Sequence, residues 1–394
     1  MIQPSDRVQN IKEYYFSIKL KEVAAMRAQG IDVVSLGIGG PDLPPAPEVI
    51  ETLQTATAQP DNHGYQPHVG VPELREAFAR WYRRWYGVEL DPKTEIQPLI
   101  GSKEGVTHVS LAFLNPGDRA LIPDPGYPTY SSITRMVGAE PVPYDLTEAN
   151  GWQPDWEALE AMDLTGVKLM WMNYPHMPTG ARARRETFER AVDFARRHNI
   201  LLVHDNPYSF ILNDEPMSLM SVPGAKDVAI EFNSLSKSHN MPGWRVGVAV
   251  SNPTYLSYLL RIKSNIDSGQ FKPVMLAAAK ALEAGPEWHA RLNEAYAERR
   301  KVAEEIMTEL GCHFDPTQSG LFLWGRATKT PNSSLLTPNS QKIADELLEK
   351  AHVFLTPGMI FGHNGDDYIR ISLCAPVPRL QEALRRIKQM KKSK

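Results

Sequence analysis

One lysine-bearing loop has the composition of a site for covalent chemistry. Lys237 lies in the polar segment Ser234-Leu-Ser-Lys-Ser-His-Asn-Met-Pro-Gly-Trp-Arg245, eight residues before the arginine. A lysine held near hydroxyls could form an imine with a phosphorylated aldehyde, because the guanidinium pairs with the phosphate and disfavours protonation of the amine. The alternative is a solvated lysine in a common type of Ser/Gly loop, so other motifs must support the chemical interpretation.

A second candidate group follows an apolar run. Asp205 and Tyr208 lie in His204-Asp-Asn-Pro-Tyr208, directly after Ile200 to Val203. If the aldehyde belongs to a pyridine ring, a buried carboxylate would keep the ring nitrogen protonated and make the ring an effective electron sink. Tyr208 could donate to a ring oxygen. An aspartate that caps a turn and an ordinary half-buried tyrosine are the alternatives.

A third motif suits an anion. The segment Gly101-Ser-Lys-Glu-Gly105 lies between a strand-like run and a predicted helix, so the backbone N–H groups at Ser102 would face a phosphate. N-capping explains the same Gly-Ser turn equally well. Tyr127, in Pro123-Asp-Pro-Gly-Tyr-Pro128, follows another strand and could either stack on a planar ring or belong to the core.

An arginine interrupts an apolar strand near the end of the chain. Arg370 lies in Tyr368-Ile-Arg-Ile-Ser-Leu373. A guanidinium in such a place needs an anionic partner. A substrate carboxylate held by two parallel hydrogen bonds is one candidate, and an internal salt bridge is the other.

The elements that position these residues alternate along the chain. Helices predicted over 72–86, 103–114 and 184–198 alternate with strands at 119–123, 168–172, 200–204 and 228–232. This order favours an α/β fold with a mainly parallel sheet sandwiched by helices, and ligands of such sheets bind at the carboxyl ends of the strands.

A different pattern follows the helical stretch 276–310. Strands at 320–324 and 368–373 and helices over 340–351 and 378–391 predict a smaller α+β domain, with an exposed loop at 327–339. We expect residues 46–285 to form the large domain, and residues 1–45 and 286–394 to form the small one.

Composition excludes several classes of protein. The 394 residues carry a net charge of −3, which gives no electrostatic footprint for nucleic acid. No apolar run approaches the ~20 residues that span a bilayer, and the N-terminus lacks the order of a signal peptide. Only Cys312 and Cys374 occur, too few for a disulfide framework or a cysteine-based metal site. We therefore expect a cytoplasmic protein without nucleic-acid or membrane partners.

Taken in order, these motifs resemble the fold-type I pyridoxal-phosphate enzymes, specifically the class I/II aminotransferases, along nearly the whole chain. The resemblance runs from Gly39-Gly-Pro-Asp42 through Gly64-Tyr-Gln-Pro-His-Val-Gly-Val-Pro-Glu-Leu-Arg75 to the Arg370 strand. It implies pyridoxal 5′-phosphate as the cofactor. Lys237 is then similar to the Schiff-base lysine, Asp205 to the partner of the pyridinium nitrogen and Tyr208 to the donor to ring oxygen O3′.

The resemblance also implies roles for the other candidates. Tyr127 would stack on the ring, Arg370 would hold the substrate α-carboxylate and Gly39 would supply substrate-side backbone. A homodimer with shared active sites is implied, because Tyr65 would reach the phosphate of the partner subunit. The remaining phosphate ligands would be Ser102, Lys103, Ser234, Ser236 and Arg245.

One position departs from the family pattern. The family usually has an asparagine just before Pro-Thr-Gly, but this chain reads Asn173-Tyr-Pro-His-Met-Pro-Thr-Gly180, with Met177 at that position. A thioether cannot donate a hydrogen bond to O3′. Asn173 or His176 could substitute, or either could be a turn residue.

The implied activity is transfer of an amino group from an L-amino acid to a 2-oxo acid, with 2-oxoglutarate as the expected acceptor, by a ping-pong mechanism. The segment Lys263–Pro273 lacks the arginine that the aspartate-specific branch often has there and is similar to LL-diaminopimelate aminotransferase-like proteins. The expected donor is therefore LL-diaminopimelate, aspartate or another amino acid. A C–S β-lyase on the same fold and a regulatory protein that binds the cofactor without turnover are the alternatives.

Overall fold

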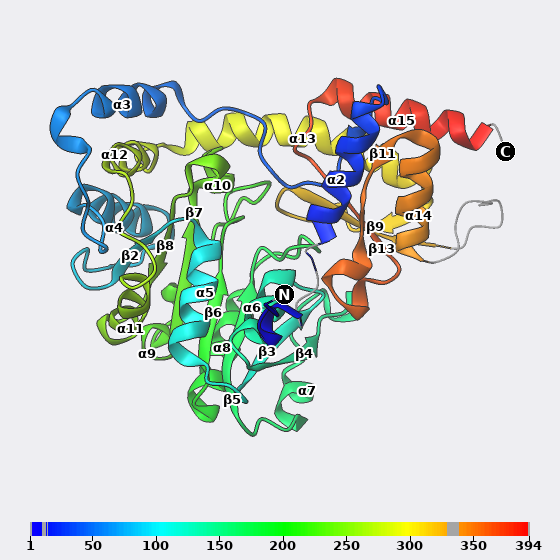
Figure 1. The fold of residues 1–394 in the computed structure, drawn as a ribbon. Helices are drawn as coiled ribbons and strands as arrows, with labels where there is room; N and C mark the ends of the chain where they lie inside the picture. Colours follow the sequence, from blue (N-terminus) through cyan, green and yellow to red (C-terminus); the bar gives the residue numbers. More distant parts are fainter. Residues whose placement is uncertain (1, 10–12, 14, 329–338, 393–394) are drawn as a thin grey trace.

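The computed structural model describes residues 2–9, 13, 15–328 and 339–392, and its main feature is a seven-stranded sheet with strand order β2-β8-β7-β6-β5-β3-β4 (Figure 1). All neighbouring strands are parallel except those that pair with β8. The sheet is therefore mainly parallel, as predicted. Its strands are β2 (Ile96–Leu99), β3 (Arg119–Asp124), β4 (Glu140–Asp145), β5 (Val167–Asn173), β6 (Leu201–Asp205), β7 (Ala229–Ser234) and β8 (Gly247–Val250).

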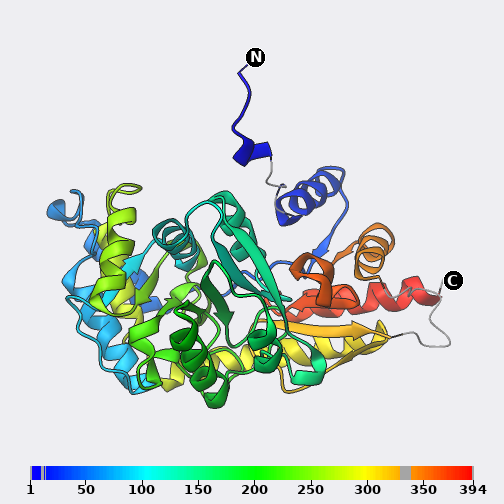
Figure 2. The same cartoon turned by 90° about the horizontal axis from the view of Figure 1, so that it is seen from below.

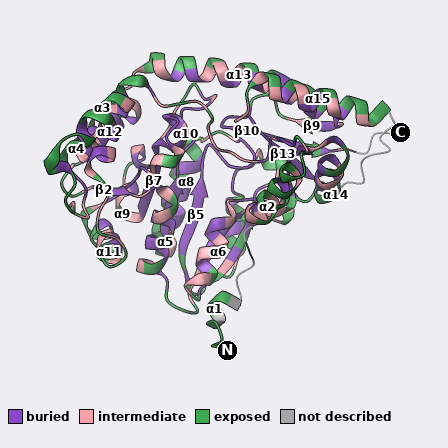
Figure 3. Ribbon diagram, turned by 45° about the horizontal axis from the view of Figure 1, so that its top comes forward, coloured by how far each residue is buried: buried purple, intermediate pink, exposed green. Residues whose placement is uncertain are grey.

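Helices cover both faces of this sheet. Successive side chains of a strand point to opposite faces, so Met170 and Trp171 of β5 belong to different core clusters. The strands are buried while the outer faces of the surrounding helices are exposed (Figure 3). One face packs against α5 (Ser102–Phe113), α6 (Pro128–Met136) and α11 (Pro253–Lys263), and the other packs against α4 (Pro72–Tyr86), α8 (Arg185–His198) and α12 (Lys272–Ala281).

Local sequence explains where these helices begin and end. Pro72 occupies the first turn of α4, where its missing N–H is no loss, and Gly87 ends the helix with φ 66°. Asn199 ends α8 in the same way with φ 52°. The shorter helices of the chain are α1 (Asp6–Gln9), α3 (Pro47–Thr57), α7 (Trp156–Ala161), α9 (Ala225–Val228) and α10 (Leu235–Ser238).

A second core lies around a smaller antiparallel sheet with strand order β12-β13-β10-β9, and a short parallel pair joins β1 to β11. In Figure 2, α13 (yellow) and α15 (red) run along one side of the molecule. The strands are β1 (Val34–Ser35), β9 (Cys312–Phe314), β10 (Phe322–Ala327), β11 (Val353–Phe354), β12 (Thr356–Pro357) and β13 (Tyr368–Ser372), and the helices are α2 (Tyr15–Ala28), α13 (Pro286–Glu309), α14 (Ser340–Glu346) and α15 (Val377–Lys392).

The structure differs from the sequence-based expectation in a few elements. The stretch 276–310 is two helices, because Gly285 and Pro286 separate α12 from α13. Strands β4 and β8 were not predicted. Most of the loop expected at 327–339 lies outside the described residues. In the part of the chain that the structure describes, no helix combines the length and apolar character needed to cross a membrane.

Candidate active site

A cavity of about 370 Å³ lies at the carboxyl ends of β5, β6 and β7, where Asn173, Asp205 and Ser234 end their strands. Side chains of the smaller sheet close its other side. The fold therefore places the cavity where parallel sheets bind ligands. Of the residues singled out in the sequence, those that line it are Gly39, Ser102, Lys103, Tyr127, Asn173, Met177, Asp205, Tyr208, Ser234, Ser236, Lys237, Arg245 and Arg370.

Lys237 reaches the cavity from α10, the short helix that follows β7. Its Nζ donates a hydrogen bond to the Gly39 carbonyl at 2.6 Å. Burial lowers the pKa of the Lys237 amine below its ordinary value, and the guanidiniums of Arg245 and Arg370 act in the same direction. A buried amine with a lowered pKa is available as a nucleophile or base.

Asp205 ends β6 and points to the cavity side of the sheet. Tyr130 of α6 donates a hydrogen bond to Asp205 Oδ2 at 2.9 Å, whereas Oδ1 is buried and has no hydrogen-bond partner among the described residues. Burial raises the pKa of Asp205 to about 6, although Tyr130 and His204 oppose the shift. The open oxygen is suited to an N–H donor from a ligand.

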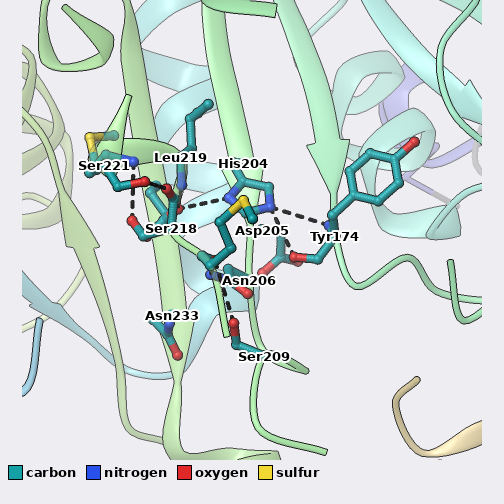
Figure 4. Close-up of polar contacts among 12 residues, drawn as sticks. Tyr174, His204, Asp205, Asn206, Ser209, Ser218, Leu219, Ser221 and Asn233 are labelled. Atoms are coloured by element: carbon teal, nitrogen blue, oxygen red, sulfur yellow. Dashed lines mark hydrogen bonds and ion pairs between the residues drawn. The ribbon is translucent and has the colours of Figure 1, made fainter. Parts of the chain in front are cut away.

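A buried polar network lies behind Asp205, on the opposite face of β6 (Figure 4). His204 Nδ1 lies 2.8 Å from Glu231 Oε2, and Ser218 Oγ donates to Glu231 Oε1 at 2.7 Å. His204 Nε2 lies 3.1 Å from the Tyr174 carbonyl oxygen. Because His204 and Glu231 are fully buried, these bonds join β5, β6 and β7 and fix the strand end that carries Asp205.

An anion cradle surrounds the first turn of α5. Gly101 precedes the helix with φ 78°, and a Cβ at this position would lie 2.1 Å from Arg245 Nη2. The absence of a side chain therefore admits the guanidinium beside the helix N-terminus. Ser236 Oγ lies 3.0 Å from Ser234 Oγ and accepts a hydrogen bond from Arg245 Nη1 at 3.4 Å.

The segment 173–180, which departs from the family pattern at Met177, makes several hydrogen bonds at the cavity. Asn173 donates to the Asp205 carbonyl at 2.6 Å and accepts from the Met177 N–H at 2.7 Å, so its amide spans the two strand ends. Met177 lines the cavity, and its sulfur accepts a hydrogen bond from Arg370 Nη1 at 3.3 Å. His176 does not line the cavity; its Nδ1 lies 2.8 Å from Thr179 Oγ1, and burial lowers its pKa to about 3.

Arg370 is buried within an aromatic enclosure. Its guanidinium lies 3.9 Å from the centre of the Phe322 ring and 4.7 Å from that of Phe361. Its Nη2 donates to the Gly37 carbonyl at 2.8 Å. Such an apolar enclosure strengthens the attraction between the guanidinium and an entering carboxylate.

Tyr65 lies apart from the other candidates. It does not line the cavity of its own chain and is 92% exposed. The sequence also did not single out Tyr130, although it lies one helical turn after Tyr127 and the spacing could have indicated it. Phe16, Leu20, Ile38, Phe322 and Phe361 reach the cavity through tertiary packing and carry no local signal.

The cavity has the groups that pyridoxal phosphate requires. The open Asp205 oxygen complements a protonated ring nitrogen. The cradle at Gly101 and Arg245 suits a phosphate. Lys237 supplies a largely desolvated amine in the same cavity. A phosphorylated pyridine aldehyde is consistent with all three features.

Comparison with known proteins agrees with this chemistry. A profile of the family "Aminotransferase class I and II" matches residues 31–387. The chain is 43% identical over 384 residues to an LL-diaminopimelate aminotransferase of Desulforudis audaxviator, covering 97% of this chain and 96% of that protein. It is similar to the apo structure of BacF from Bacillus subtilis, with a TM-score of 0.93, 37% identity and coverage of 99% of both chains.

A more distant structure has the same fold. A single mutant of Thermus thermophilus aspartate aminotransferase superposes with a TM-score of 0.90 at 28% identity, covering 99% of this chain and 100% of that chain. The profile match spans most of the chain and the curated relative exceeds 40% identity. The chain therefore belongs to the class I and II aminotransferases and is a pyridoxal-phosphate-dependent enzyme that transfers amino groups.

Proposed function

We propose that the cavity beside Lys237 is the site of this amino-group transfer. The observation that supports the proposal best is the meeting, around one cavity, of a buried amine, an open carboxylate oxygen at Asp205, an anion cradle and the buried guanidinium of Arg370. Bound pyridoxal phosphate supplies an electron sink that acidifies the α-hydrogen of an amino acid. The residues around it then have separate tasks.

The cradle and its neighbours hold the cofactor. Asp205 keeps the ring nitrogen protonated, and Tyr127 packs against the ring. Tyr208 and Asn173 would contact O3′, and burial raises the pKa of the Tyr208 hydroxyl so that it remains a donor. The phosphate ligands are Ser102, Lys103, Ser234, Ser236 and Arg245.

Lys237 binds the cofactor covalently and then moves protons. As a free amine, Lys237 Nζ would be the general base that takes the proton from the donor's α-carbon. The lowered pKa of this amine leaves more of it neutral at physiological pH, which favours the step.

Arg370 and Gly39 orient the substrate. The planar guanidinium can donate two parallel hydrogen bonds to the α-carboxylate. Gly39 lies between the guanidinium and the lysine amine: its carbonyl accepts from Lys237, and it packs against Phe322, whose ring lies against the Arg370 guanidinium. The substrate α-carbon would therefore lie between the clamp and the base.

The proposal includes a homodimer in which Tyr65 completes the partner's phosphate site. The Tyr65 loop packs against a second exposed apolar residue, because the His63 and Phe271 rings lie 5.8 Å apart and Phe271 is 43% exposed. An interface would bury both. We also propose a cytoplasmic location and the domain division 46–285 with 1–45 and 286–394; the boundary at 285 coincides with the break before α13.

The substrates follow from the named relatives. LL-diaminopimelate is the first donor to test, because the curated relatives bear that name. Aspartate and other amino acids come next, and 2-oxoglutarate is the proposed acceptor. These small molecules are the proposed partners of the chain.

A donor screen tests the activity. The holoenzyme is mixed with single amino acids, and the conversion of the cofactor absorbance to that of its amine form is followed. Formation of pyruvate and ammonia from a thioether amino acid would instead indicate a C–S lyase, and absence of conversion across the panel would indicate a binding protein.

The Lys237→Ala variant tests the site itself. After borohydride reduction and digestion, mass spectrometry of the wild type should find the cofactor on the Lys237 peptide, and the variant should carry none while keeping its fold. Lys103→Ala is the matched control, because Lys103 lines the same cavity but should not carry the cofactor. Cofactor on a lysine other than Lys237 would remove Lys237 from the proposal.

A further inference from the structure

The cavity has two chemically different ends. The end around Lys237, Asp205 and Arg245 is polar and is the proposed cofactor site. The other end surrounds Arg370 with apolar side chains, and none of these neighbours carries a charge. Phe16, Phe322, Phe361 and Met177 contact the Arg370 guanidinium, and Leu20 and Ile38 also line the cavity.

The charges of the lining restrict what can bind at the apolar end. Among the described residues, Asp205 is the one carboxylate that lines the cavity, and the basic residues of the lining are Lys103, Lys237, Arg245 and Arg370. In the proposed holoenzyme Lys237 is bonded to the cofactor and Lys103 and Arg245 face its phosphate, so Arg370 is the cation left for a substrate carboxylate. A second ammonium on a donor would find no anionic partner in this chain, because Asp205 is occupied by the cofactor ring.

Helix α2 forms the part of the apolar end that could select side chains. Phe16 and Leu20 are four residues apart and therefore lie on one face of the helix, toward the cavity. An ion pair of 2.9 Å between Lys19 Nζ and Asp345 Oδ1 ties α2 to α14, and the two helices lie close together in Figure 1. The pair holds Phe16 and Leu20 over the substrate end.

We infer that this site also takes L-amino acids with an uncharged apolar side chain, aliphatic or aromatic, and that Phe16 and Leu20 select them. The inference rests on the proposed function, since it assumes that Arg370 holds the α-carboxylate. The donor loses its amino group and α-hydrogen and becomes a 2-oxo acid, and the 2-oxo acid acceptor gains both. The transamination itself therefore supplies every atom and electron.

Binding of unreactive carboxylates tests the inference without turnover. Isothermal titration of the holoenzyme is carried out with 3-phenylpropanoate, 4-methylpentanoate and glutarate, which mimic aromatic, aliphatic and acidic substrates without their amino group. The wild type should bind the two apolar probes about tenfold more tightly than glutarate, because apolar pockets discriminate on this scale.

Two variants on one helix sharpen the test. Leu20→Arg places a cation at the apolar end. It should weaken the binding of 3-phenylpropanoate about tenfold and strengthen the binding of glutarate. Ile18→Arg is the matched control, because Ile18 is 47% exposed, like Leu20 at 45%, but does not line the cavity. The ratio of kcat/KM for phenylalanine and leucine to that for aspartate and LL-diaminopimelate should shift in the same direction.

The outcomes separate this inference from the proposed function. If Arg370→Lys weakens all three probes but Leu20→Arg leaves their ranking unchanged, the α2 selection is wrong and the carboxylate clamp stands. If the wild type binds glutarate more tightly than both apolar probes, the inference is overturned. If Leu20→Arg reverses the ranking while Arg370→Lys has no effect, the apolar end is supported and the clamp must lie elsewhere.

Discussion

Asp205 shows how one residue couples cofactor binding to stability. Burial raises the pKa of this carboxyl from 3.8 to about 6, so the folded, cofactor-free protein holds the proton more tightly than the unfolded chain does. The free energy of unfolding therefore falls as the pH rises from about 4 to about 6 and Asp205 ionises, and it stays lower above that range. At ~1.4 kcal/mol per pKa unit, the cost reaches about 3 kcal/mol.

The Asp205→Asn variant should thus be the more stable cofactor-free protein at pH 8, by up to about 3 kcal/mol in urea unfolding, and lose this advantage below pH 4. With cofactor bound the order should reverse, because the carboxylate gains a ring N–H partner. Asp267→Asn is a useful contrast: Asp267 accepts hydrogen bonds from Lys263 and from the Gly269 backbone N–H, and its pKa is lowered despite burial, so its loss should destabilise. Equal stability of wild type and Asp205→Asn at pH 8 would contradict the argument.

Arg370→Lys keeps the charge but loses the planar fork. We expect a loss on the order of 2 to 5 kcal/mol of transition-state binding, about thirtyfold to several thousandfold in kcat/KM, with cofactor affinity little changed. Steady-state kinetics with both substrates and a cofactor titration measure the two effects separately. A variant whose only defect is a lower Tm would make Arg370 a structural residue.

Met177 was the residue on which the sequence was least informative. The motif showed that a donor to O3′ was missing but not what the side chain does instead, because its sulfur meets Arg370 only after β13 packs against the segment that follows β5. The same holds for Phe16, whose contact with Arg370 joins residues far apart in the chain.

At the scale of the elements, the α5 N-terminus depends on a glycine. Gly101→Ala would force a Cβ to within 2.1 Å of Arg245 Nη2 and place alanine at φ 78°. We expect cofactor affinity to fall at least about tenfold, as measured by titration of the cofactor-free protein, because the cradle loses its guanidinium. Gly117→Ala is the matched control: it has φ 88° but nothing within 4 Å, so it carries backbone strain alone. Similar affinity losses in both variants would remove the cradle from the explanation.

The strands at the centre of the large sheet could be predicted because they are continuous apolar runs. Strands β5, β6 and β7 are buried along nearly their whole length, and such runs can be recognised without tertiary information. Strand β4 was missed because Pro141 and Pro143 are typical of non-strand segments; the structure tolerates them because β4 is an edge strand. Strand β8 (Gly247–Val250) is a fully buried apolar run and was missed, although the equally short β2 (Ile96–Leu99) lies in a stretch that was expected to be strand-like.

At the scale of the whole molecule, the exposure of Tyr65 makes a prediction about assembly. Tyr65→Ala and Lys237→Ala should each lower activity strongly as separate homodimers. When the two are unfolded and refolded together, hybrid dimers should regain activity, because one of their two sites combines an intact Lys237 with an intact partner tyrosine. Activity and subunit composition after mixing measure this. Absence of recovery in confirmed hybrids would show that each chain holds a complete site.

The alternation of β6 has a consequence for how this enzyme can change over generations of mutation. His204 and Asp205 are consecutive but face opposite sides of the sheet, one toward the buried Glu231 and one toward the cavity. In a library that records both protein abundance in cells and turnover, replacements at His204 should mainly reduce the amount of folded protein. Replacements at Asp205 should leave abundance near normal and reduce turnover per molecule. Two adjacent codons would thus be under selection for different properties: that of His204 for the amount of folded protein, and that of Asp205 for catalytic turnover.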